Sequence, residues 1–178
     1  MLKKVLMAGA VIVAGLAVFI NAQPAPFIVT RSATIAATPA TVFALVNDFH
    51  QWDAWSPWAK IDPAMTKSYE GAPTGVGAIY TWSGNNDVGT GRMTIADSTP
   101  NESIGVKLEF TKPFSATNIA TFTFKPDGNG SAVNWSMSGN KNFMQKAFFL
   151  VTDMDKMLGS DFEKGLAQMK TVAEAAAK

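Results

Sequence analysis

The sequence predicts an α+β protein in which a curved antiparallel β-sheet wraps around a long C-terminal helix, with a separate membrane helix at the N-terminus. Several short runs between residues 78 and 138 alternate apolar and polar side chains, which is typical of a sheet with one apolar face. Beyond residue 143, apolar side chains recur every three or four positions, as in an amphipathic helix. Residues 5–20 contain no polar side chain and follow neither pattern.

The N-terminal apolar run has the form of a secretory signal, either cleaved or retained. Lys3 and Lys4 precede it, and a polar, proline-containing stretch follows it. Cleavage requires small residues at two positions before the cut, and a cut after Ala22 would place Ile20 at one of them. We therefore expect a retained anchor in place of a removed peptide. A core helix of the folded domain is a weaker alternative, because the run lacks a polar face.

The two lysines also predict the orientation of the chain. Positive residues that flank a membrane helix stay on the cytoplasmic side, so the rest of the chain should lie on the periplasmic or extracellular side. We expect residues 1–22 to form a signal anchor that contacts the membrane through residues 5–20. Residues 23–178 should then form one ligand-binding domain.

The overall composition excludes several classes of function. The 178 residues include 15 Lys and Arg against 14 Asp and Glu, a net charge of +1. Nucleic acid is not an expected partner, because binding a polyanion requires a concentrated basic face. The chain has no cysteine and a single histidine, which excludes thiolate nucleophiles and clusters of Cys or His metal ligands. We expect no metal and no other cofactor.

The first elements of the domain are a strand and a short helix. Residues 27–36 are extended, and Thr38 with Pro39 provides a helix N-cap followed by proline at the first helical position. Val42, Phe43 and Val46 give this helix one apolar face.

The central part of the chain predicts the sheet. Turn-forming residues at 84–87, 100–101 and 126–130 separate its runs. The inward-facing residues of these runs are Tyr80 and Trp82, Met93 and Ile95, Val106, Leu108 and Phe110, Ala120, Phe122 and Phe124, and Val133, Trp135 and Met137.

Residues 143–175 predict one long amphipathic helix, bent near Gly159, where helix propensity falls. The apolar stripe of such a helix must be buried, and the apolar face of the sheet is the large apolar surface on which the helix can pack.

In this order of elements the sequence resembles the START-related superfamily, also called SRPBCC, and in particular its membrane-anchored polyketide cyclase/dehydrase-like members. The resemblance covers most of residues 27–175. It rests on residues 31–35, Pro39 with Val42 and Phe43, Asp48 with Trp52, Trp55 and Trp58, residues 75–78 and 80–82, residues 157–162, and Gly165 with Leu166. It implies the helix-grip fold with a deep apolar cavity between sheet and helix, used for lipids, sterols or aromatic polyketides. It implies no fixed catalytic residues.

Large apolar side chains on the inner face of the sheet and on the final helix are the candidate ligand-binding residues. Methionine adapts to irregular shapes and suits a cavity that accepts varied apolar ligands. The alternative is that the same side chains fill an ordinary close-packed core. For residues 52–58, which hold three tryptophans, the alternatives are an aromatic rim of the cavity and a plug at one end of the sheet. The candidate residues are Trp58, Tyr80, Trp82, Phe110, Phe122, Trp135, Met137, Met154 and Met157.

No set of residues predicts a catalytic site. The groups available for proton transfer are His50, Tyr69, Tyr80 and Arg92, and an enzyme would need two of them in one cavity. His50 lies in a polar loop, and Arg92 is expected to face solvent. The acidic residues of the final helix, Asp153, Asp155, Asp161 and Glu163, are interpreted as a solvated face and not as a cation site.

The sequence favours a non-catalytic module that binds a hydrophobic or aromatic small molecule, lipid-like or polyketide-like, while tethered to a membrane. One alternative is a polyketide cyclase or dehydratase that shapes its substrate and supplies one or two proton-transfer groups. The other is a structural protein of the cell envelope that works through its surface.

Overall fold

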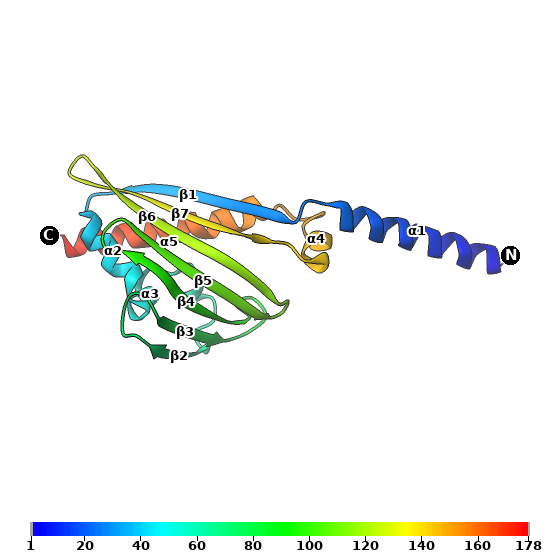
Figure 1. The fold of residues 1–178 in the computed structure, drawn as a ribbon, viewed down its shortest axis with the longest axis horizontal. Helices are drawn as coiled ribbons and strands as arrows, with labels where there is room; N and C mark the ends of the chain where they lie inside the picture. The colour runs from blue at the N-terminus through cyan, green and yellow to red at the C-terminus, as the bar shows by residue number, and fades with distance from the viewer. Residues whose placement is uncertain (1, 178) are drawn as a thin grey trace.

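The computed structural model describes residues 2–177 and confirms the predicted fold class (Figure 1). Seven antiparallel strands form one curved sheet in the order β1-β7-β6-β5-β4-β3-β2, and the C-terminal helix α5 lies along its concave side. The strands are β1 (Pro26–Ile35), β2 (Thr66–Gly71), β3 (Ala78–Ser83), β4 (Thr90–Thr99), β5 (Ser103–Lys112), β6 (Ala116–Asp127) and β7 (Gly130–Asn140). The helices are α1 (Leu2–Ala22), α2 (Pro39–Asn47), η1 (Phe49–Gln51), α3 (Trp52–Trp55), η2 (Pro57–Lys60), α4 (Phe143–Phe148) and α5 (Met154–Ala176).

The alternating sequence pattern corresponds to alternating burial in the strands. Along β7, Val133, Trp135 and Met137 are buried, and the residues between them are only partly covered. The sheet bends where β4 shifts its register against β5, at Thr90/Gly91 and between Ile95 and Asp97. The edge strand β2 was not predicted, because its polar sequence lacks the apolar alternation of the other strands.

Helix α1 is long and apolar enough to cross a membrane. Its most apolar 18-residue window has a mean hydropathy of 2.4, and that window is 6% buried. At about 1.5 Å per residue, a helix of this length spans about 30 Å, which matches the hydrocarbon core of a bilayer.

The predicted start of α2 is confirmed. The side chain of Thr38 accepts a hydrogen bond from the backbone N–H of Thr41, and Pro39 occupies the first helical turn. Together with α3 and η2, this helix covers one end of the sheet beside α5.

The prediction of one helix over residues 143–175 is wrong, because the chain leaves the helical conformation between α4 and α5. The Asp153 side chain accepts a hydrogen bond from the backbone N–H of Lys156 and so caps a new helix. Gly159 lies inside the continuous helix α5 and not at a bend. Its missing side chain lets Arg31 of β1 approach the helix closely. A Cβ atom at Gly159 would collide with the guanidinium of Arg31 on β1.

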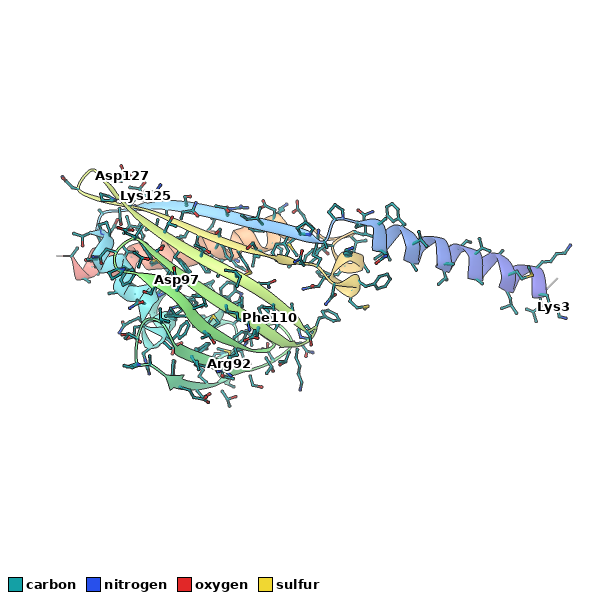
Figure 2. All side chains as sticks on the ribbon, viewed as in Figure 1. Lys3, Arg92, Asp97, Phe110, Lys125 and Asp127 are labelled. Carbon is teal, nitrogen blue, oxygen red and sulfur yellow. The ribbon has the colours of Figure 1, made fainter. Side chains whose placement is uncertain are left out.

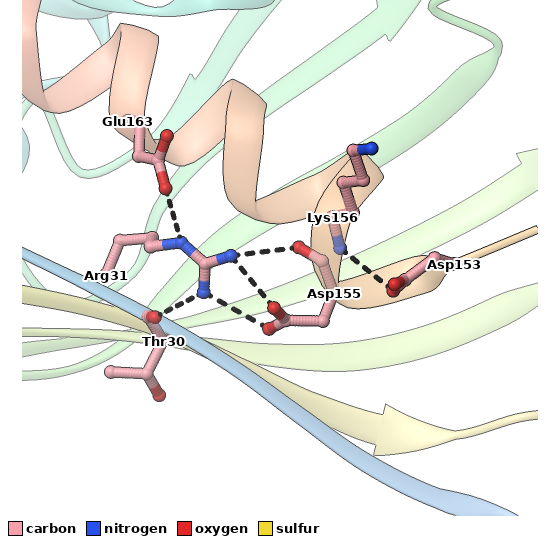
Figure 3. A network of polar contacts seen from close by, with 6 residues as sticks. All are labelled: Thr30, Arg31, Asp153, Asp155, Lys156 and Glu163. Atoms are coloured by element: carbon pink, nitrogen blue, oxygen red, sulfur yellow. Dashed lines mark hydrogen bonds and ion pairs between the residues drawn. The ribbon is translucent and has the colours of Figure 1, made fainter.

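Arg31 fixes the beginning of α5 to the edge strand β1 (Figure 3). Its Nε donates to Glu163 Oε1 at 2.7 Å, and its Nη2 donates to Asp155 Oδ2 at 2.9 Å. Nη1 also donates to the backbone carbonyl of Thr30 at 2.8 Å. Asp155 and Glu163 are exposed, as the interpretation of a solvated face predicts, with 63% of each side chain accessible to solvent. The sequence pattern did not reveal that both carboxylates pair with a residue more than one hundred positions earlier in the chain.

We predict that this contact weakens in acid. The hydrogen bonds from Arg31 hold the pKa of Asp155 below its ordinary value of 3.8. A carboxylate with a lowered pKa stabilises the fold above its unfolded-state pKa and loses this contribution as the pH falls through the folded-state value. Thermal unfolding of Asp155→Asn should therefore depend less on pH below 3.8 than unfolding of the unmodified chain. Asp97→Asn, an exposed change on β4, is the control, and an equal effect of both substitutions would contradict the prediction.

The core at the far end of the sheet from α1 is densely packed. Phe162, Leu166, Met169 and Ala173 of α5 are at most 2% exposed there. Next to them, the indole of Trp135 lies in a stack, 4.1 Å from the ring of Phe162 and 4.9 Å from the ring of Phe122. This aromatic stack forms the boundary of the packed region.

Candidate functional site

A cavity of about 360 Å³ lies between the sheet, the first turns of α5 and helix α4. Its walls are mostly apolar and come from elements far apart in the sequence. Leu108, Phe110 and Met137 line it from the sheet, Met154 and Leu158 from α5, and Phe149 from the segment after α4.

The strand register places this cavity at the end of the sheet where α1 joins the domain. Phe27 of β1 pairs with Gly139 of β7, which pairs with Asn118 of β6. Phe110, near the end of β5, pairs with Gly91 near the start of β4. The cavity and the packed region therefore occupy opposite ends of the same sheet–helix interface.

Seven of the nine candidate ligand-binding residues line the cavity, and they come from η2, three strands and α5. They are Trp58, Tyr80, Trp82, Phe110, Met137, Met154 and Met157. The remaining two, Phe122 and Trp135, lie in the aromatic stack at 0% and 1% exposure and are outside the cavity wall. Phe162 of α5 fills the space in front of them, so these two rings have the role of close-packed core.

The three tryptophans of residues 52–58 divide between the two alternatives. Trp55 is fully buried and packs edge-on against Trp135, so it acts as a plug. Trp52 and Trp58 line the cavity. The indole N–H of Trp52 donates to the Val46 carbonyl at 3.0 Å, which orients the ring against α2.

Asn118 is a buried polar residue in the cavity wall that sequence reasoning missed. Its side chain is among the lining groups and the residue is 7% exposed. Within residues 2–177, Asn118 Oδ1 has no hydrogen-bond partner. This oxygen faces Gly139 of β7, and burial of an unpaired amide oxygen is costly. A signal was available, because Asn118 continues the inward series of Ala120, Phe122 and Phe124.

Tyr80 is a second polar group on the cavity wall. Burial raises the pKa of its phenol well above the ordinary range, and the nearby Tyr69 and Asp53 raise it further. The phenol therefore stays protonated near neutral pH. It can donate or accept a hydrogen bond at the wall.

The other three proton-transfer candidates lie away from this cavity. Arg92 is exposed on β4 (Figure 2), as expected. His50 and Tyr69 line a second hollow of about 180 Å³, where their rings stack 4.1 Å apart. The His50 ring is 2.9 Å from Asp48 Oδ1. Partial burial raises the pKa of Asp48, but hydrogen bonds from His50 and Gln51 together outweigh burial and leave the pKa below its ordinary value.

Among the described residues, no group of three or more His, Asp or Glu side chains is placed to hold a metal ion. The acidic residue of α5 that borders the cavity is Asp161, and it pairs with Lys164 at 3.0 Å.

Comparisons with known proteins agree with this architecture. The family model described as polyketide cyclase/dehydrase and lipid transport matches residues 26–174. A comparison with curated protein sequences gives no match.

Several solved structures are similar to this chain at low sequence identity. The protein CV1439 from Chromobacterium violaceum has a TM-score of 0.61 and 14% identity, over 83% of this chain and 96% of its own. The Aha1 dimer from Colwellia psychrerythraea has a TM-score of 0.60 and 14% identity, over 83% and 96%. An uncharacterized protein from Rhizobium leguminosarum has a TM-score of 0.62 and 13% identity, over 86% and 97%. These similarities establish a shared helix-grip fold.

Proposed function

Because the chain belongs to the polyketide cyclase/dehydrase and lipid transport family, we propose that its cavity binds a hydrophobic or aromatic small molecule, lipid-like or polyketide-like, without altering it. The observation that carries this proposal is the 360 Å³ space between the sheet and α5. Small-molecule sites typically have volumes of about 300–1,000 Å³, with mainly apolar walls and a few polar groups. This cavity fits that description.

The cavity wall favours an apolar guest with one polar group. Met137, Met154 and Met157 supply flexible thioether side chains that adjust to irregular shapes. Asn118 and Tyr80 supply the polar contacts, and the raised pKa of Tyr80 keeps its phenol neutral. The ligand class that suits these groups is a hydrophobic molecule that carries a hydroxyl group.

We further propose that α1 tethers the domain to a membrane. Its length and hydropathy suit a single span. Lys3 and Lys4 would remain in the cytoplasm under the positive-inside rule, which puts residues 23–178 on the periplasmic or extracellular side.

Calorimetry on the full chain in lipid nanodiscs tests ligand binding. Methylnaphthalene, titrated into loaded and empty nanodiscs of the same lipid, should give saturable heat only with the protein. Absence of saturable heat would refute ligand binding.

We predict that Asn118→Leu has opposite effects on stability and on recognition of a hydroxyl group. An unpaired buried polar group costs about 1–3 kcal/mol, so its removal should raise the thermal unfolding temperature. The affinity for a naphthol should fall about tenfold, equivalent to about 1.4 kcal/mol. The affinity for methylnaphthalene, which lacks the hydroxyl group, should be unchanged.

The control for this prediction is Asn134→Leu. Asn134 lies on β7 outside the cavity, and its side chain donates to Ser32 Oγ. Equal losses of naphthol affinity in both variants would show that Asn118 has no specific part in recognition.

A further inference from the structure

Large apolar side chains are exposed on α4, on the segment that leads into α5 and on the first turn of α5. We name six of these residues the α4 patch: Phe143, Met144, Phe148, Leu150, Val151 and Met157. Their exposed fractions run from 41% at Leu150 to 87% at Val151. A concentration of exposed apolar surface within 15 consecutive residues is typical of an interaction site.

The α4 patch lies beside the end of the apolar helix α1 (Figure 1). Lys146 Nζ of α4 donates to the backbone carbonyl of Asn21 at 2.8 Å. Among the described residues of α1, Ile20 is the buried one, and it belongs to the same last turn. These contacts hold α4 at the level where α1 ends.

The turn between β5 and β6 extends this apolar surface. Asn142 Nδ2, at the start of α4, donates to the carbonyl of Ser115 at 3.1 Å. The neighbouring Phe114 is 42% exposed. Lys141 and Lys146 are close by in the sequence and carry positive charge.

We propose that the α4 patch lies in the interfacial layer of the bilayer that α1 crosses, so that the cavity exchanges its ligand directly with lipid. This inference rests on the proposed membrane anchor and on the proposed ligand-binding function. The occupant is a bilayer because the patch continues the apolar surface of α1 at the depth where a spanning helix reaches the headgroups. Apolar side chains next to lysines are typical of interfacial helices.

The same helix connects the bilayer to the cavity. Gln145 of α4 and Phe149, which directly follows the last residue of α4, line the cavity. Met144 and Phe148 of the same helix are exposed. Met157 belongs to both surfaces, since it lines the cavity and is 46% exposed. A hydrophobic molecule that enters beside α4 would pass from lipid to the cavity with little exposure to water.

The absence of cysteine from the sequence allows a direct test with single labels. Val151→Cys and Phe148→Cys, each carrying an environment-sensitive fluorophore, are placed in nanodiscs that hold one copy of the full chain and contain lipids with a spin label on the acyl chain. Both labels should be quenched severalfold more strongly than a label at Asn129→Cys. Asn129 is exposed in the β6–β7 turn, at the far end of the domain.

An additional label separates the possible failures. A label at Ile12→Cys, in the middle of α1, could be quenched by the lipids while the α4 labels are quenched by aqueous iodide. That result would support the anchor and overturn the inference about α4. If the label at position 12 is also open to iodide, the proposed anchor fails as well. Protection of the α4 labels only in nanodiscs with two copies would show that a second chain covers the patch, which also overturns the proposal. Calorimetry with methylnaphthalene reports on ligand binding separately.

Discussion

Replacement of Trp135 by alanine is expected to lower the free energy of unfolding by about 3–5 kcal/mol, the usual cost of removing a large buried aromatic side chain. The indole is 1% exposed and stacks between Phe122 and Phe162. It also meets Trp55 edge-on at 5.6 Å. Its loss would open a void where the sheet and α5 are in closest contact.

Chemical denaturation followed by near-ultraviolet circular dichroism measures this effect. Trp58→Ala is the matched control, because Trp58 contacts the same ring at 5.8 Å but lines the cavity and is only partly buried. Trp135→Phe should cost much less than alanine. It keeps an aromatic ring in the stack and removes an indole N–H that has no partner among the described residues. Equal losses for Trp135→Ala and Trp58→Ala would contradict the division between packed and hollow regions.

The second large effect is expected from a substitution that fills the cavity. Met137→Trp places an indole where Met137 now lines the space, so the affinity for methylnaphthalene should fall at least about tenfold, or about 1.4 kcal/mol. The fold should persist, because the added volume enters an existing void instead of a close-packed core.

Calorimetry in nanodiscs gives the affinity, and thermal unfolding checks the fold. Met144→Trp makes the same chemical change on the exposed side of α4, outside the cavity wall, and should bind as the unmodified chain does. Unchanged affinity in Met137→Trp would mean that the probe binds elsewhere on the protein.

The sheet could be predicted from sequence because inward and outward positions alternate along each strand. The alternation predicts that Val133, Trp135 and Met137 lie on the inner face, and all three are buried there. The break between α4 and α5 was missed because Phe149, Leu150 and Val151 continue the apolar run of α4. The signal for a new helix was Asp153, an N-capping residue type at the right place.

Alternation identifies the face of a side chain but not the distance to the opposite layer. Trp135 and Met137 are two residues apart on one face, yet Trp135 meets Phe162 and Met137 borders a void. That difference depends on where α5 approaches the sheet, which is a tertiary property. The Arg31 contacts have the same origin, since Asp155 lies 124 residues further along the chain.

The packed region and the cavity lie at opposite ends of the sheet–helix interface, and this separation allows the cavity to change while the fold is kept. The aromatic stack and the later turns of α5 supply most of the close packing, so partly exposed cavity residues such as Met154 and Met157 can change with little loss of fold. New ligand specificities can therefore evolve, or be selected from libraries, by substitutions in the cavity wall, while the packed region keeps the protein stable.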